Sequence, residues 1–289
     1  KPNQYRNNDF SMKCVITAAG KGTRLLPVTK EIPKEMLPIF AKLANGEKIM
    51  MPMLQLIFED LYNNGIRNYC FIVDNSKRAI KNHFSIDSLH NNKLLSTQKI
   101  FLQSFYKKIK KSNLVWIKQH QPLGFGDAVK RSESYIGNDD FLVHGGDVSI
   151  LSKANSTIPR LIKTHNDNPS ASAILLCKKI TNPKNYGVPE LMKINSSLFS
   201  VTGVEEKPKN PKSAYGLLPC YIFKPIIFKY LHKIKQGKNN EYQLTDAIKG
   251  LIADGHEVLA IPINSSEFEL DVGNVQSYYD ALNKSFKKC

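Results

Sequence analysis

The chain has 289 residues, of which 42% are hydrophobic and 23% are charged. This composition supports a substantial core and argues against a disordered protein. No apolar run approaches the roughly 18 residues of a membrane-spanning helix, and the stretch from Lys1 to Phe10 lacks the apolar segment of a secretory signal. We therefore expect a cytoplasmic protein with no membrane partner.

The charge of the chain is strongly positive and unevenly distributed. Lys and Arg total 41 against 25 Asp and Glu, which gives a net charge of +16. Residues 77–118 hold ten basic residues and a single acid, and residues 207–240 hold eight lysines and no acid. Such an excess indicates anionic partners such as phosphates, nucleic acid or an acidic surface. For residues 77–118 we favour the exposed basic face of a helix, so no nucleic-acid partner is expected.

The cysteines argue against a disulfide scaffold and against a zinc site. There are five, Cys14, Cys70, Cys177, Cys220 and Cys289, and no two of them form a Cys-x-x-Cys pair. An odd number at wide spacing predicts reduced thiols. The seven histidines show no close pair at metal-ligand spacing, so we interpret them as structural or surface residues.

The first half of the chain alternates predicted strands with predicted helices. Short apolar runs predict buried strands, and apolar residues at helical spacing predict helices. Strands are expected at residues 13–19, 68–74, 114–118 and 141–144, and helices at residues 52–64, 77–84, 89–111 and 126–135. This alternation is typical of a largely parallel sheet covered by helices on both faces, with ligands at the carboxyl ends of the strands.

The second half of the chain consists of shorter predicted elements, because five prolines between residues 183 and 219 interrupt it. Strands are expected at residues 172–177, 198–205 and 217–223, and helices at residues 225–235, 243–254 and 274–287. Neither an internal repeat nor a low-complexity linker separates the two halves. This favours one domain with two lobes.

A glycine-containing loop follows directly on the first predicted strand. In Gly20-Lys21-Gly22, successive backbone N–H groups can converge on a phosphate. The loop is neither a Walker A loop nor a dinucleotide fingerprint, since Leu25 replaces the third glycine and Pro27 interrupts the helix that should follow. On its own, this pattern leaves both a phosphate-binding loop and an ordinary tight turn open.

The longer run Ala18–Pro38 closely resembles the signature of the sugar-1-phosphate nucleotidylyltransferases. Within that family, the chain is most similar to the bacterial-type UTP–glucose-1-phosphate uridylyltransferases, also called UDP-glucose pyrophosphorylases. Further family blocks follow in the family's order, and the resemblance extends over about residues 13–285. These blocks are Ser76-Lys77, Asn82-His83-Phe84, Gln119, Gly124-Phe125-Gly126-Asp127-Ala128, Gly146-Asp147, Tyr186-Gly187-Val188, Glu205-Glu206-Lys207-Pro208, Glu241–Ile248 and Asp271-Val272-Gly273-Asn274.

The resemblance implies an α/β fold of the Rossmann-like, glycosyltransferase-A-like type. Its mixed, mostly parallel central sheet is flanked by helices and accompanied by a smaller sugar-binding lobe. We expect residues 1–12 to form a polar N-terminal tail and residues 13–289 to form a single domain. Residues 13–150 would be the nucleotide-binding half, and residues 151–289 the sugar-binding half with a closing helix. The resemblance also implies a homo-oligomer, either a dimer or a tetramer.

The implied reaction joins UTP and glucose 1-phosphate to give UDP-glucose and pyrophosphate. An oxygen of the sugar phosphate attacks the α-phosphorus in line, and this phosphate is largely ionised at neutral pH because its second pKa is near 6. Positioning and positive charge are therefore needed more than a general base. The same residues would suit a thymidylyltransferase or an enzyme of broad specificity, since one methyl group is worth only about 1 kcal/mol. A catalytically silent regulatory or scaffold protein is the remaining alternative.

The resemblance also assigns roles to the residues of its motifs. Arg24, Lys34 and Lys207 are the implied catalytic residues, which would neutralise the phosphates of the two substrates. Gln119 would bind the edge of the uracil base, and Gly124 would offer it a backbone contact. The implied nucleotide-binding residues are Ala18, Ala19, Gly20, Gly22, Thr23, Gln119, Gly124 and Asp147.

A second set of implied residues serves the sugar phosphate and a metal ion. The implied sugar-phosphate-binding residues are Tyr186, Gly187, Glu206 and Lys207. Asp147 and Asp271 are the implied ligands of Mg²⁺, which prefers oxygen ligands, waters and substrate phosphates. The chain departs from the family pattern at Pro219, where glycine is usual, and in the additional segment Ala41–Ile49. We interpret this segment as a lid or a surface loop.

Overall fold

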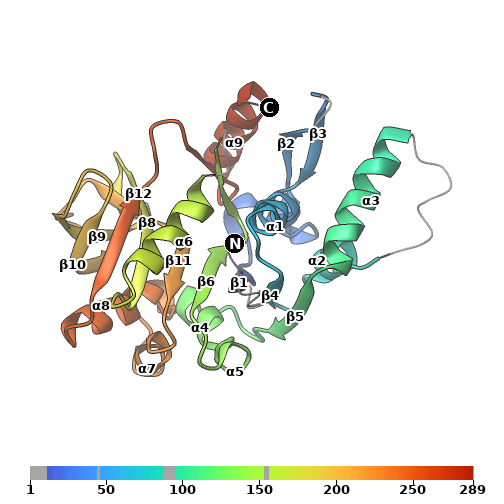
Figure 1. The fold of residues 1–289 in the computed structure, drawn as a ribbon. Coiled ribbons are helices and arrows are strands. Elements are labelled where there is room, and N and C mark those ends of the chain that lie inside the picture. The colour runs from blue at the N-terminus through green and yellow to red at the C-terminus, as the bar shows by residue number, and fades with distance from the viewer. Residues whose placement is uncertain (1–11, 44–45, 87–95, 153–155, 289) are drawn as a thin grey trace, which may run out of the picture.

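The computed structural model describes residues 12–43, 46–86, 96–152 and 156–288. Within these ranges, nine strands form a central sheet in the order β5-β4-β1-β6-β11-β8-β12-β10-β9 (Figure 1). The strands are β1 (Lys13–Ala18), β4 (Asn68–Val73), β5 (Asn113–Lys118), β6 (Phe141–Gly145), β8 (Ala173–Lys179), β9 (Gly187–Lys193), β10 (Phe199–Glu206), β11 (Tyr215–Phe223) and β12 (Val258–Pro262).

Most strands of the central sheet point in the same direction. β1 lies parallel to both β4 and β6, β4 lies parallel to β5, and β8 lies parallel to β12. Only β11 and β10 oppose their two neighbours in the sheet, among the strands described. The prediction of a mixed, mostly parallel sheet is therefore confirmed.

Helices cover both faces of the central sheet, as predicted. In the described part of the chain they are α1 (Met53–Asn63), α2 (Arg78–His83), α3 (Ser96–Lys110), α4 (Phe125–Lys130), α5 (Glu133–Ile136), α6 (Thr157–Asp167), α7 (Ile227–Leu231), α8 (Leu244–Ala253) and α9 (Val275–Lys288). Side chains of a strand alternate between faces, so Cys14 and Ile16 pack with α1, α3, α6 and α9, whereas Val15 packs with α4, α5, α7 and α8.

Most predicted elements lie within two residues of the bounds that the sequence indicates. One exception is the helix over residues 126–135, which divides into α4 and α5. Ser132, buried between them, donates its hydroxyl to the Val129 carbonyl at 2.7 Å. A second exception is the helix over residues 225–235, which shortens to α7. Residues 1–11 of the expected tail and residues 89–95 of the expected helix lie outside the described residues.

Two small antiparallel sheets were not predicted. The hairpin of β2 (Pro38–Lys42) and β3 (Lys48–Pro52) includes both ends of the segment Ala41–Ile49 that we interpreted as a lid or surface loop, and Ala41 pairs with Ile49 there. The second small sheet pairs β7 (Val148–Leu151) with β13 (Phe268–Asp271). Four-residue strands without an alternating pattern give little sequence signal. Strands β9 and β12 and helix α6 were also missed.

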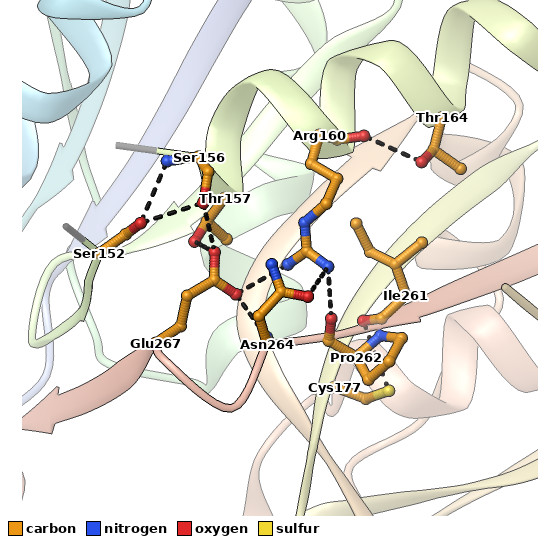
Figure 2. A network of polar contacts seen from close by, with 10 residues as sticks. All are labelled: Ser152, Ser156, Thr157, Arg160, Thr164, Cys177, Ile261, Pro262, Asn264 and Glu267. Carbon is orange, nitrogen blue, oxygen red and sulfur yellow. Dashed lines mark hydrogen bonds and ion pairs between the residues drawn. The ribbon is translucent and has the colours of Figure 1, made fainter. Parts of the chain in front are cut away.

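A buried carboxylate holds the loop before β13 against the start of α6 (Figure 2). Glu267 accepts hydrogen bonds from the hydroxyls of Ser156 and Thr157 at 2.9 and 2.7 Å. It also accepts from the Arg160 guanidinium at 2.8 Å and from the backbone N–H of Asn264 at 2.6 Å. These four donors satisfy the buried carboxylate and hold the loop before β13 against the start of α6.

The composition predicts reduced cysteines and no membrane-spanning helix. Cys14, Cys70, Cys177 and Cys220 are buried, and none of them forms a disulfide, which agrees with reduced thiols. None of the helices in the described ranges combines the length and the apolar character needed to cross a membrane.

Replacing Asp60 with asparagine is expected to stabilise the fold at neutral pH. Burial raises the pKa of Asp60 to about 6, and the Asn64 side chain only partly offsets this effect. The ionised carboxylate is thus disfavoured in the folded state, so its cost grows as pH rises from about 4 to about 6 and then stays constant. Urea unfolding should show a gain of about 3 kcal/mol at pH 7 and a much smaller gain at pH 4. Equal gains at both pH values would contradict the assignment.

Candidate active site

Two adjoining cavities lie at the carboxyl ends of the parallel strands. The first has a volume of about 880 Å³ and the second about 560 Å³. Arg24, Asp147, Lys207 and Pro219 line both cavities, so the two meet at these residues. The residues implied by the resemblance that line the first cavity are Ala19, Gly20, Gly22, Thr23, Arg24, Lys34, Gln119, Gly124, Asp147 and Lys207. Those that line the second are Arg24, Asp147, Tyr186, Gly187, Glu206, Lys207 and Asp271. Ala18 lines neither cavity and is buried in the core.

The loop after β1 turns sharply to bring its backbone to the first cavity. Gly22 has φ 66°, a left-handed conformation that favours glycine. Thr29 donates its hydroxyl to the Gly22 carbonyl at 2.7 Å and so fixes the turn. A Cβ at Gly20 would lie 3.3 Å from the Lys34 side chain. The glycine therefore lets Lys34 pass close to the loop and reach the cavity.

Lys34 forms an ion pair with Asp147 in the wall of the first cavity. Burial alone lowers the pKa of Lys34, but the charges of Asp147 and Glu35 outweigh it and raise that pKa above its usual value. For Asp147, burial raises the pKa, and the Lys34 charge outweighs burial and lowers it. Both side chains are therefore held in their charged forms, ready to face phosphates or a cation.

A second ion pair lies directly beneath the loop, and sequence reasoning gave it no role. Lys77 and Glu35 are 4% and 1% exposed, and the Lys77 Nζ lies 2.9 Å from the Glu35 Oε2. Lys77 also donates to the Gly20 carbonyl at 2.8 Å. Burial raises the pKa of Glu35, opposed by the charges of Lys77 and Lys34. Glu35 follows Lys34 directly in the sequence. The Lys77–Glu35 pair therefore holds Gly20 of the glycine-containing loop close to the segment that carries Lys34.

The pairing of β13 with β7 brings Asp147 and Asp271 close together. Asp271 pairs with Val148, and the Val272 N–H donates to the Asp147 carbonyl at 3.0 Å. Burial raises the pKa of Asp271, and the charge of Asp147 raises it further. A Cβ at Gly273 would lie 2.8 Å from the Asp271 Oδ1 and 3.3 Å from the Arg24 guanidinium, so Arg24 lies near the two carboxylates.

This donor set fits Mg²⁺ better than a metal bound wholly by protein. No group of three or more His, Cys, Asp or Glu residues that could hold a metal ion occurs within the described ranges. Mg²⁺ is commonly bound by one or two carboxylates, with waters and substrate phosphates as the other ligands. The mutual repulsion of Asp147 and Asp271 is what a cation between them would relieve.

The segment around Gln119 and Gly124 is tightly held. Gln119 is buried, and its amide nitrogen donates to the Gly124 carbonyl at 3.2 Å and to Asp127 at 2.7 Å. Gly124 has φ 109°, and a Cβ there would lie 2.8 Å from both the Glu241 side chain and the Tyr242 carbonyl. Glycine is therefore required at this position. The amide nitrogen of Gln119 is already engaged within the chain, which leaves less freedom for it to contact a base.

Thr245 and Tyr186 position the glutamate and the lysine that line the second cavity. The Thr245 hydroxyl donates to the Glu206 Oε2 at 3.1 Å, and the Lys207 backbone N–H donates to the Tyr186 carbonyl at 2.9 Å. Lys207 has φ 47°, which is unusual for a residue with a side chain. A Cβ at Gly187 would lie 2.6 Å from the Thr245 side chain. Thr245 was not among the implied residues, although it lies in a quoted family block.

Pro219 replaces the expected glycine in β11 and lines both cavities. The pairing of β11 with β8 is irregular between Leu217 and Tyr221, which is consistent with a residue that has no N–H to donate. A Cβ at Gly145 would lie 3.0 Å from the Pro219 ring. The departure from the family pattern thus changes the wall at the junction of the two cavities.

Comparison with known proteins gives the family. The sequence matches the nucleotidyl transferase family over residues 13–288. It is 32% identical to the UTP–glucose-1-phosphate uridylyltransferase of Mycoplasma pneumoniae over 269 residues, 91% of this chain and 88% of that protein. For the Mycoplasma genitalium enzyme of the same name, the identity is 35% over 241 residues, 82% and 79% of the two chains. A solved structure of a UDP-glucose pyrophosphorylase complexed with UDP-glucose has a TM-score of 0.84 and 27% identity, and the likeness covers 97% of this chain and 100% of the other.

These similarities span both halves of the chain. The cavities likewise draw residues from both halves, since Arg24 and Asp147 meet Lys207 and Asp271 there. Family, fold and cavity residues agree on an enzyme that transfers nucleotidyl groups. The chain belongs to the nucleotidyl transferase family.

Proposed function

We propose that this enzyme transfers the uridylyl group of UTP to the phosphate of glucose 1-phosphate, giving UDP-glucose and pyrophosphate. The observation that carries the proposal is the junction of the two cavities, where Arg24, Asp147 and Lys207 line both. Two polyanions that react with each other must meet at a point where positive charge offsets their repulsion. The names of the relatives and the structural neighbour support UTP and glucose 1-phosphate as the pair.

In this proposal, each cavity takes one substrate. The loop with Gly20 and Gly22 and the segment of Gln119 and Gly124 would hold the nucleotide in the first cavity. Glu206 would accept hydrogen bonds from sugar hydroxyls in the second, and Lys207 would bind the sugar phosphate. In the same proposal, residues 13–150 form the nucleotide-binding half of the chain and residues 151–289 the sugar-binding half.

The proposed reaction requires the protein to position the two substrates and to neutralise the charge of their phosphates. The attacking phosphate oxygen is already ionised at neutral pH, so no residue needs to remove a proton from it. Lys34, oriented by its ion pair with Asp147, and the neighbouring Arg24 would stabilise the charge that passes to the leaving pyrophosphate. Lys207, held at an unusual φ by the Tyr186 carbonyl, would fix the nucleophile. Asp147 and Asp271 would hold Mg²⁺, which when bound supplies further neutralisation of the phosphates.

Pyrophosphate release tests the proposal directly. We expect rapid release with glucose 1-phosphate and UTP in the presence of Mg²⁺, and at least a hundredfold less when EDTA removes the metal. A comparable rate with dTTP would favour a thymidylyltransferase or broad-specificity enzyme instead. No release with any nucleoside triphosphate would contradict the proposal and favour a silent scaffold, although Arg24, Lys34 and Lys207 all line the cavities. A homo-oligomeric state and a cytoplasmic location stay predictions.

A further inference from the structure

One wall residue of the second cavity, Glu269, belongs to an ion pair that the proposed reaction does not use. Glu269 lines this cavity together with Glu206 and Asp271. It lies two residues before Asp271 in β13, and residues at this spacing point to the same side of a strand. The Lys178 ammonium binds the Glu269 Oε2, and the two side chains are only 18% and 12% exposed. A carboxylate is therefore fixed in the wall of the cavity.

Lys178 and Tyr186 make the surroundings of Glu269 rigid. The Lys178 ammonium lies 4.8 Å from the centre of the Tyr186 ring, a cation–π arrangement. The ring also packs against Gly216 of β11, where a Cβ would lie 2.8 Å from the Tyr186 Cγ. Gly216 pairs with Lys178 in the central sheet. The cluster of Lys178, Tyr186 and Glu269 thus joins the central sheet to the small β7–β13 sheet.

The Lys178–Glu269 pair differs from an ion pair that only links two helices, because one of its members lines a cavity of the candidate site. Glu59 and Lys108 form an ion pair of similar burial, with side chains 15% and 18% exposed. This pair joins α1 to α3, and neither residue lines either of the two cavities. Glu269, in contrast, faces the same cavity as Glu206, the residue to which we assign sugar hydroxyls. A carboxylate has two oxygens that accept hydrogen bonds, and Lys178 occupies only part of this capacity.

We propose that Glu269 is a sugar-binding residue, which Lys178 holds beside Tyr186 so that its carboxylate accepts hydrogen bonds from hydroxyls of the sugar. The ligand is the hexose of the sugar phosphate, and later that of the nucleotide sugar. This inference rests on the proposed function, because it takes the second cavity to be the sugar site. It adds a second carboxylate acceptor to Glu206 in that site.

The test separates sugar binding from nucleotide binding. In E269Q, we expect the KM for glucose 1-phosphate to rise about tenfold and the KM for UTP to change less than twofold. The tenfold change corresponds to the free energy that a hydrogen bond to a charged group typically contributes. The double variant K178M/E269M should show the same split, because replacing both members of a buried pair by apolar residues is often tolerated by the fold. The matched control E59Q removes one carboxylate of a similarly buried pair and should change neither KM.

Calorimetric binding supplies a readout that does not depend on turnover. Wild-type protein should bind UDP-glucose more tightly than UDP, and E269Q should weaken UDP-glucose about tenfold while leaving UDP unchanged. If both ligands weaken equally, or if E269Q leaves UDP-glucose and the KM for glucose 1-phosphate unchanged, the inference is wrong. If the wild-type protein itself neither turns over glucose 1-phosphate nor binds UDP-glucose, the proposed function fails instead.

Discussion

Replacing Arg24 with alanine is expected to lower kcat roughly 100- to 1,000-fold, the usual cost of removing one donor that stabilises transition-state charge. Arg24 lines both cavities, at the point where the two substrates would meet. Because its side chain is exposed, its loss should leave the fold intact. Steady-state pyrophosphate release with saturating UTP and glucose 1-phosphate measures the effect.

The control for this prediction is Lys30→Ala. Lys30 is an exposed cation in the same segment, but it lines neither cavity of the candidate active site. Its removal should change kcat less than about threefold, because isolated surface charges act weakly through water. An equal loss in both variants would mean that Arg24 acts only through general charge, and a loss below threefold in R24A would remove Arg24 from the mechanism.

Replacing Lys77 with methionine is expected to lower the free energy of unfolding by about 3–5 kcal/mol. The substitution leaves Glu35 as an uncompensated charge that is 1% exposed, and it removes the donor to the Gly20 carbonyl. The Glu35 carboxyl can avoid part of this cost by taking up a proton, since burial already raises its pKa. The loss measured by urea unfolding should therefore be larger at pH 8 than at pH 5.

Two further variants make the Lys77 prediction specific. K77M/E35M removes both charges and should recover most of the lost stability, since an apolar pair of similar volume often replaces a buried ion pair without cost. K163M removes the cation of the exposed Lys163–Asp167 pair and should cost less than about 1 kcal/mol. The explanation fails if the double variant is no more stable than K77M, or if K77M behaves like K163M.

The strands of the first half could be predicted closely because each is a short apolar run. β1, β4 and β6 are almost wholly buried between two helical layers, so their residues are apolar on both faces, whatever the rest of the chain does. The small β7–β13 sheet had no such signal. Its strands have mixed burial and are stabilised by each other and by the Glu267 network, whose members lie far apart in the sequence.

Most motif residues that the sequence singles out do line the two cavities, but the side chains that position them could not be predicted. Lys34 was expected at the site, whereas its neighbours Glu35 and Lys77 were named only as members of stretches that resemble family motifs. Thr245 and Glu269 carry no distinctive spacing, since a threonine at a helix start and a glutamate in a short strand have many ordinary explanations. Which distant side chain meets which is decided by the packing of sheets and helices, and the order of residues does not reveal it.

The pairing of β7 with β13 also has a consequence for the order in which the molecule assembles. β1, β4, β5 and β6 all precede residue 146, so they are synthesised before β13 and can fold first. Asp271 meets Asp147 only where β13 pairs with β7, so this contact needs residues from both halves of the chain. A partly folded chain can therefore present the lysines of the first cavity while it still lacks the second carboxylate. Both carboxylates are therefore present together only once the chain has been synthesised as far as residue 271.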